Sequence, residues 1–275
     1  MNQPSAEDIV RQATAAFNAG HPDEARRLCE TGLSGAPGDP MLHHLLAAVL
    51  FSQGEVQRAR SHIGTSLEKR PGNAAAHLLA ARIARAAGDF DGALSHLDRA
   101  IAIAPQRDAF VEKARTLDQA SQHQPNLGFP ARAAWRAILE VIPQHQEAAA
   151  RLGRLTWEDG DHRAAAGLLE RAAIGDAPAS VWFDLGLVRH DLGDYAGAAK
   201  AYRKALEIRP DFPEAHVNLG SNLQQSGDLQ SAMDSYRQAL RLRPDSFGRI
   251  AQALTSAKTG QLWLNLGRLR RSLGA

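Results

Sequence analysis

The chain has 275 residues, of which 44% are hydrophobic, 23% are charged and 5% are aromatic. This composition is that of a globular protein and excludes a disordered chain. No apolar run reaches the roughly 18 residues that a membrane span needs, and the first residues lack the features of a signal peptide. The single cysteine excludes a disulfide framework and a cysteine-based zinc cluster. We therefore expect a cytoplasmic protein that contains little β-sheet.

The net charge of +2 is unevenly distributed along the chain. Residues 247–275 hold five basic and no acidic residues, which leaves 27 basic and 30 acidic residues on the remainder. The body is thus mildly acidic and the C-terminal segment is basic. Five cations without a basic run are too few to indicate a nucleic-acid-binding surface, so we expect no nucleic acid partner.

Three residue types recur along the chain with a period of about 34 residues. Each glycine is expected to adopt the left-handed conformation that ends a first helix, and an acidic residue usually follows it. Each alanine is expected where two helices cross closely, and each proline stops a second helix. The three series are Gly20, Gly54, Gly88, Gly193 and Gly227; Ala25, Ala59, Ala93, Ala131, Ala165, Ala198 and Ala232; and Pro37, Pro71, Pro105, Pro143, Pro210 and Pro244.

Between these markers the apolar residues recur at spacings of three and four, as in Leu94, Leu97 and Ile101. The pattern therefore predicts a series of helix–turn–helix units. The fourth unit departs from it, with four extra residues within 121–125 and Asn126 in the glycine position. Asparagine is the residue after glycine that best tolerates the left-handed conformation. The fifth unit is one residue short, and we expect a shallow break that separates units one to three from units five to seven.

The last two units carry the motif most fully. They contain Trp182-x-x-Leu185-Gly186, Gly193-Asp194-Tyr195, Ala198, Tyr202, Ala205-Leu206 and Pro210, followed by Leu219-Gly220, Gly227, Ala232, Tyr236, Ala239-Leu240 and Pro244. This pattern resembles the tetratricopeptide repeat. The resemblance implies an all-α fold, namely a right-handed superhelical solenoid of antiparallel helix pairs with a C-terminal capping helix and a short tail.

The predicted solenoid covers residues 1–246, and residues 247–275 form the capping helix and the basic tail. The predicted units are 6–39, 40–73, 74–107, a degenerate 108–145, 146–178, 179–212 and 213–246.

The C-terminal segment is expected to begin with one more helix, which has Ser246 as its N-cap and an apolar face that includes Ile250 and Leu254. Residues 261–265 no longer follow the repeat and are expected to be extended, and residues 266–273 are expected to form a short amphipathic helix. Two interpretations remain open. Either this segment folds back and caps the stack, or it contacts a partner through Trp263, Arg268 and Arg271.

Motifs of catalysis are absent from the sequence. It contains no phosphate-binding glycine loop, no His-Glu-x-x-His motif and no nucleophile elbow. Cys29 occupies a position that is apolar in the other units, so we expect a buried and unreactive thiol. We therefore predict no enzyme activity, no catalytic residue and no cofactor.

The eleven histidines do not indicate a metal site. His43, His77 and His216 occupy the position of Trp182 in its own unit, and we interpret them as packing residues with one hydrogen-bonded nitrogen. His62 and His96 are expected in neighbouring units, whose helix axes are about 8–10 Å apart. This spacing is too wide for a shared zinc ion, so we predict no bound metal.

The resemblance implies binding of an extended peptide or a partner helix to an inner surface built by the first helices. Arg82 with Arg85, and Arg151 with Arg154, are i, i+3 pairs that each share one helix face. Such pairs suit carboxylates or phosphates, although a solvated face is the alternative. The candidates on the inner surface are Arg11, Asn18, Arg82, Arg85, Arg151, Arg154, Asp184, Asn218 and Gln225.

Asn218 occupies the position at which peptide-binding members of the family hold the backbone or terminal carboxylate of a ligand. The corresponding early positions hold Arg11, Leu45 and Leu79, which argues against a full carboxylate clamp. A local hydrogen bond to a neighbouring helix is the other interpretation of Asn218.

We therefore predict a non-catalytic scaffold or adaptor for protein–protein interaction, whose partner carries acidic or carboxylate-bearing segments. The alternative is an accessory or substrate-recruiting subunit of a separately encoded enzyme, of the transferase or hydroxylase type. A sensor of small ligands or modified peptides is a third hypothesis. The composition, rich in alanine and arginine, suggests a bacterial source.

Overall fold

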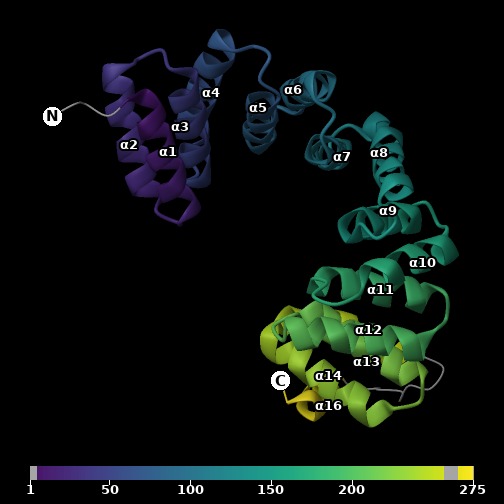
Figure 1. The fold of residues 1–275 in the computed structure, drawn as a ribbon. Coiled ribbons are helices and arrows are strands. Elements are labelled where there is room, and N and C mark those ends of the chain that lie inside the picture. The colour runs from purple at the N-terminus through teal and green to yellow at the C-terminus, as the bar shows by residue number, and fades with distance from the viewer. Residues whose placement is uncertain (1–4, 257–265, 275) are drawn as a thin grey trace. The chain divides into compact units, whose positions relative to one another are not determined.

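The computed structural model describes residues 5–256 and 266–274 of the chain (Figure 1). All of the secondary structure in these two ranges is helical, in sixteen α-helices and two short 3-10 turns. Consecutive helices pack in antiparallel pairs, as the repeat pattern predicts. Within the same ranges, no helix has both the length and the apolar character needed to cross a membrane. The all-α fold predicted from the sequence is thus confirmed.

The chain divides into two compact units, Met1–Ala134 and Trp135–Ala275. The boundary falls within α8 (Gly128–Val141), in the stretch where the repeat spacing is irregular. The first unit contains α1 (Ala6–Asn18), α2 (Pro22–Gly35), α3 (Pro40–Ser52), α4 (Val56–Lys69), α5 (Ala74–Ala86), α6 (Phe90–Ile103) and α7 (Arg107–Ser121). The second contains α9 (Gln146–Glu158), α10 (His162–Ala172), α11 (Ala179–Asp191), α12 (Tyr195–Ile208), α13 (Pro213–Gln225), α14 (Leu229–Leu242), α15 (Phe247–Ser256) and α16 (Leu266–Leu273).

The turn between the two helices of a pair is set by a glycine and an aspartate. Gly88 has φ +79°, a conformation that side chains rarely adopt, and it ends α5. Asp89 then caps α6, because its carboxylate accepts a hydrogen bond from the Gly92 N–H at 2.9 Å. The prediction of left-handed turn glycines is confirmed at Gly20, Gly54, Gly88, Gly193 and Gly227.

The prediction for the fourth repeat, residues 108–145, is wrong in one respect. Asn126 lies within a 3-10 turn, η1 (Pro125–Leu127), and no described residue other than glycine has a positive φ. The extra residues provide the turn instead. The N–H groups of His123 and Gln124 both donate to the Ala120 carbonyl, at 3.0 and 2.9 Å, so the chain leaves α7 without a left-handed residue.

Two buried residues recur at fixed positions in the second helix of each repeat. All seven alanines of the series from Ala25 to Ala232 are 0% exposed. Four residues after each alanine comes a second buried residue, and burial of a side chain of the size of leucine or isoleucine contributes about 1.5–3 kcal/mol. These residues are Cys29, Ile63, Leu97, Trp135, Leu169, Tyr202 and Tyr236.

Glycines in the first helices of the second unit make room for two of these residues. A Cβ atom on Gly220 would lie 2.5 Å from the ring of Tyr236, and one on Gly186 would lie 2.5 Å from the ring of Tyr202. Both distances are shorter than any normal contact between carbon atoms. The absence of a side chain at these two positions therefore sets how closely the helices of each pair approach.

Within the second unit, the C-terminal helices α15 and α16 pack against α13 and α14. Leu269 and Leu273 of α16 are buried in the same cluster as Ile250 and Leu254 of α15. The Arg237 side chain of α14 donates to the Ser272 carbonyl at 3.2–3.3 Å. The predicted helix at 266–273 is confirmed, and the predicted extended segment 261–265 lies outside the described residues.

The N-cap predicted at Ser246 is wrong. Ser246 ends the 3-10 turn η2 (Pro244–Ser246), and its buried hydroxyl has no hydrogen-bond partner within the described part of the chain. The chain therefore enters α15 through this turn rather than through a capping side chain.

We predict that Gly220→Ala destabilises the protein by about 1–2 kcal/mol, because the added methyl group displaces Tyr236 and overpacking outweighs the gain in helix propensity. The matched control is Gly167→Ala in α10, since a Cβ there meets nothing within 4 Å. The control should stabilise the protein by about 0.5–1 kcal/mol. Urea denaturation followed by circular dichroism measures both changes, and equal stabilisation by the two variants would contradict the close approach at Gly220.

Candidate functional site

Two of the predicted arginines meet a buried carboxylate in the first unit. Glu112 of α7 is only 2% exposed at its side chain, and Arg85 Nε lies 2.8 Å from its Oε1. Arg82 Nε lies 3.5 Å from Oε2, and Arg115 lies 3.4 Å from the same oxygen. Three guanidinium groups from α5 and α7 therefore surround one carboxylate.

The distances and exposures within this arginine cluster, Arg82, Arg85 and Arg115 around Glu112, are unequal. Arg85 is held most firmly, because its guanidinium also donates to Gln119 Oε1 at 3.1 Å. Arg82 is 39% exposed and makes the longest contact with Glu112. Arginine can bind a carboxylate through two parallel hydrogen bonds. Arg82 is thus the member of the cluster best placed to bind an external carboxylate.

A second group of predicted residues meets in the second unit. Arg154 of α9 donates to Glu158 on its own helix at 3.2 Å and to Asp184 of α11 at 3.1 Å. Burial raises the pKa of the Asp184 carboxyl, and the charge of Arg154 opposes this rise. Arg151 lies one turn earlier on α9 and is exposed. Arg154 therefore links two neighbouring first helices, α9 and α11.

Further polar bonds link neighbouring first helices of the second unit. The indole N–H of Trp157 donates to Asp191 Oδ2 at 2.7 Å, across 34 residues of sequence. His190 Nδ1 and Asn222 Oδ1 are 3.0 Å apart, which links α11 to α13. These bonds fix the register of one repeat against the next.

The remaining candidates lie at separate places. Arg11 is exposed and forms an ion pair with Asp8, and Asn18 is exposed at the end of α1. Gln225 is half-buried in the last residue of α13. Arg271 is exposed on α16, whereas Trp263 and the side chain of Arg268 lie outside the described residues.

Asn218 has a partner in the neighbouring second helix. Burial raises the pKa of Tyr202, and a side-chain hydrogen bond with Asn218 opposes this rise. The structure therefore places Asn218 against Tyr202, which is the arrangement of the local hydrogen bond considered from the sequence.

The buried partner of the arginine pair was missed by the sequence argument. A signal was present, because Glu112 stands 34 residues after Leu78 and 68 after His44 on a helix face that packs inward. An acidic residue in such a position needs cations from a neighbouring helix. Arg82 and Arg85 lie one repeat earlier and provide them.

The histidines form two equivalent pairs in the first unit. His43 and His62 approach Nδ1 to Nδ1 at 2.9 Å, and His77 and His96 do so at 3.0 Å. The other nitrogen of His43 and of His77 bonds a proline carbonyl at 2.9 Å. The prediction of a hydrogen-bonded nitrogen is confirmed for His43, His77 and His216, whereas the pairing of His43 and His77 with a second histidine was not predicted. The described residues contain no group of three or more potential metal-ligating side chains.

Burial lowers the pKa of His62 and of His96, and the facing imidazole lowers each further. Burial also raises the pKa of the Cys29 thiol to about 11. This thiol is fully buried, so it remains protonated and unreactive near neutral pH, as predicted.

Four family models match the chain. One, described as TPR repeat, matches residues 186–227, and three, described as tetratricopeptide repeat, match residues 10–63, 50–117 and 213–246. Together they span more than half of the chain, at the positions of the recurrent glycines and alanines. The chain belongs to the tetratricopeptide repeat family.

Known proteins share parts of this arrangement. Tetratricopeptide repeat protein 8 of Caenorhabditis elegans is 44% identical over 45 residues, which are 16% of this chain and 9% of that protein. A crystal structure of MamA is 24% identical, with a TM-score of 0.52, over 60% of this chain and 95% of that one.

PilF of Pseudomonas aeruginosa is 16% identical, with a TM-score of 0.64, over 76% of this chain and 94% of that one. The Cut9–Hcn1 hetero-tetramer of the APC/C is 14% identical, with a TM-score of 0.64, over 88% of this chain and 48% of that one. At these identities the similarity to the solved structures concerns the fold.

We predict that Glu112→Gln lowers the free energy of unfolding by about 2–3 kcal/mol, because three arginines then lose their shared carboxylate. The control is Glu30→Gln. Glu30 pairs with Arg26 at 3.0 Å but is 45% exposed, so its loss should cost less than about 1 kcal/mol. Urea denaturation of the two variants measures the difference, and equal losses would contradict the account of the cluster.

We also predict that the protein becomes less stable as the pH falls from about 7.5 to about 5.5. The pKa values of His62 and His96 lie below the ordinary 6.5, so the unfolded chain takes up more protons in this range. Stability is therefore present above the ordinary pKa and is lost as the pH falls. Burial lowers the pKa of His44 and His216 in the same direction.

Thermal denaturation at several pH values measures how stability depends on pH, and the double variant His62→Asn, His96→Asn should weaken this dependence, with His44 and His216 providing the remainder. An unchanged dependence in this variant would assign it to other groups.

Proposed function

We propose that this chain is a non-catalytic scaffold that binds an acidic segment of a protein partner along its first helices. The observation that carries the proposal is the arginine cluster of the first unit. Arg82, Arg85 and Arg115 surround a single buried carboxylate, and their side chains are 29–41% exposed. A partner carboxylate that approaches Arg82 meets a partly desolvated cation, where an ion pair is worth more than one in bulk water.

The cluster is held in place before a partner arrives. Arg85 is bonded to both Glu112 and Gln119, so its side chain loses little conformational freedom on binding. Positioned guanidinium groups of this kind can bind a planar carboxylate through paired hydrogen bonds. This supports glutamate or aspartate side chains, or a chain terminus, as the recognised groups.

Family membership supports the scaffold role. Tetratricopeptide repeats are arrays in which each unit packs against its neighbours and leaves extended surfaces for partners. Cut9 is found with Hcn1 in a hetero-tetramer, which illustrates such an assembly for that protein. We extend the proposal to a cytoplasmic and bacterial setting, and to a single solenoid of seven repeats that ends in the cap 247–275.

We predict that Arg82→Gln weakens the binding of a glutamate-rich peptide about tenfold at low salt, because one charge-assisted hydrogen bond to the peptide is lost. The control is Arg58→Gln on α4. Arg58 is 49% exposed and pairs with Glu55, the residue that precedes α4, so it lies on the second helix of its repeat and outside the arginine cluster. Fluorescence anisotropy with a labelled peptide measures both affinities, and the wild-type affinity should fall as salt is added. The proposal fails if the glutamine counterpart of the peptide binds equally well, or if Arg82→Gln and salt have no effect.

A further inference from the structure

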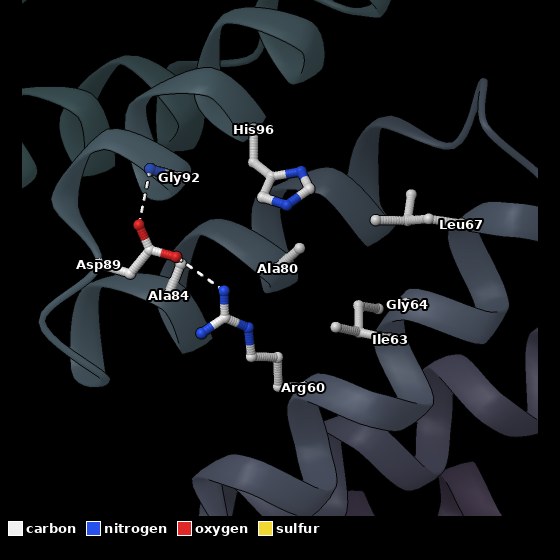
Figure 2. A pocket seen from close by; sticks show the side chains of 9 residues that line it. All are labelled: Arg60, Ile63, Gly64, Leu67, Ala80, Ala84, Asp89, Gly92 and His96. Carbon is white, nitrogen blue, oxygen red and sulfur yellow. Dashed lines mark hydrogen bonds and ion pairs between the residues drawn. The ribbon is translucent and has the colours of Figure 1, made fainter.

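A pocket of about 230 Å³ lies between α4, α5 and α6 of the first unit (Figure 2). Its apolar wall includes Ile63, Leu67, Ala80 and Ala84. Pockets that hold drug-sized ligands have volumes of roughly 300–1,000 Å³. This pocket is smaller, so it suits a group of the size of one side chain.

An ion pair lies on one side of the opening. Arg60 donates to Asp89 Oδ2 at 2.8 Å, and the other oxygen of Asp89 caps α6 at Gly92 (Figure 2). Because Asp89 is bonded on both sides, the guanidinium of Arg60 is held beside the pocket. A guanidinium in this position favours the face of an aromatic ring.

The pocket exists because its lining differs from that of the preceding repeat. Where the pocket has Gly64, Gly92, Ala80 and Ala84, the preceding repeat has the larger residues Glu30, Arg58, Leu46 and Leu50, each 34 residues earlier. The other residues that line the pocket are similar in chemical type to the residues 34 positions earlier. Arg26 and Glu55 form an ion pair at 2.7 Å that corresponds to Arg60 and Asp89. Four reductions in side-chain size thus open a space within an otherwise repeated arrangement.

The charged residues of the preceding repeat form ion pairs with one another. Arg58 lies 2.6 Å from Glu55 and 3.7 Å from Glu30, so both acidic groups share its charge. Gly64 and Gly92 remove this network from the next repeat and leave Arg60 and Asp89 beside an apolar hollow.

The polar group inside the pocket is His96, and the tautomer of its neutral form follows from its neighbours. The Pro71 carbonyl can only accept a hydrogen bond, so His77 donates to it through Nε2–H at 2.9 Å. Neutral His77 then has a lone pair on Nδ1, and His96 must donate to it through Nδ1–H across 3.0 Å. Neutral His96 is left with an unprotonated Nε2, which is a hydrogen-bond acceptor.

This acceptor faces the pocket. Figure 2 shows the imidazole of His96 above Ala80, with one ring edge directed toward the space between Ala80, Ile63 and Arg60. Within the described ranges of the chain, the structure gives Nε2 of His96 no hydrogen-bond partner. A ligand that fills the pocket can therefore donate one hydrogen bond at this point.

We propose that the pocket binds a tyrosine side chain of a protein partner. The ring packs against Ile63, Leu67, Ala80 and Ala84, and the phenol hydroxyl donates to His96 Nε2. Tyrosine combines the three properties that the lining selects, namely an apolar body, an aromatic face beside Arg60 and one terminal donor. The site does not use the arginine cluster, so it is independent of the acidic-peptide proposal.

The test compares N-acetyl-tyrosinamide with N-acetyl-phenylalaninamide, which lacks only the hydroxyl group. Each is titrated into the ¹⁵N-labelled chain near neutral pH and followed by nuclear magnetic resonance. We expect the tyrosine probe to bind with a Kd of about a millimolar and to shift the amides of Gly64 and Gly92. The phenylalanine probe should bind about three- to tenfold more weakly, because it cannot bond His96.

A variant that fills the pocket tests its location. Gly64→Glu restores the residue type of the preceding repeat, and a Cβ at Gly64 meets nothing within 4 Å, so the fold is preserved. The variant should weaken the tyrosine probe at least about tenfold. Gly167→Glu introduces the same side chain at an equally open helical position of the second unit and should leave binding unchanged.

The outcomes separate the parts of the proposal. Equal binding of the two probes would overturn the acceptor assigned to His96. Unchanged binding in Gly64→Glu, or shifts confined to other helices, would overturn the pocket as the site. The absence of saturable binding by the tyrosine probe would overturn the proposal as a whole.

Discussion

The close crossing of two helices over a fully buried alanine is the interaction on which the rest of the structure depends. It recurs in each second helix, and the second buried residue four positions later packs beside it. An array of this kind lacks a single central core, because each repeat buries its apolar surface against its neighbours. Gly186 and Gly220, which face Tyr202 and Tyr236, allow the two helices of their pairs to approach closely. The positions outside these crossings are therefore free to vary from one repeat to the next.

Variation at such positions produces the chemistry of the first unit. Glu112 lies at the position that Leu78 occupies one repeat earlier, and three arginines form ion pairs with it. Gly64 and Gly92 replace a pair of charged residues and leave a pocket. Both sites rest on the same backbone arrangement. The departures from the repeat are thus better indicators of function than the repeat itself.

The sequence predicts the backbone well because turns and crossings depend on local residue types. The left-handed glycines, the buried alanines and the helix at 266–273 all follow from short-range patterns. The prediction from the sequence is wrong at Asn126, where a 3-10 turn replaces the expected left-handed residue. It is also wrong at Ser246, where a second 3-10 turn replaces the expected N-cap. The partner of Arg82 and Arg85, and the pairing of His77 with His96, depend on side-chain directions across separate helices. Spacing alone does not fix those directions.

The central claim is that the arginine cluster around Glu112 forms a binding surface for acidic segments. The most direct measurement maps amide chemical shifts of the labelled chain while a glutamate-rich peptide is added. The account predicts that the largest changes occur in α5 and α7, around Arg82, Arg85 and Glu112, and that added salt reduces them. Changes confined to other helices, or changes insensitive to salt, would contradict it.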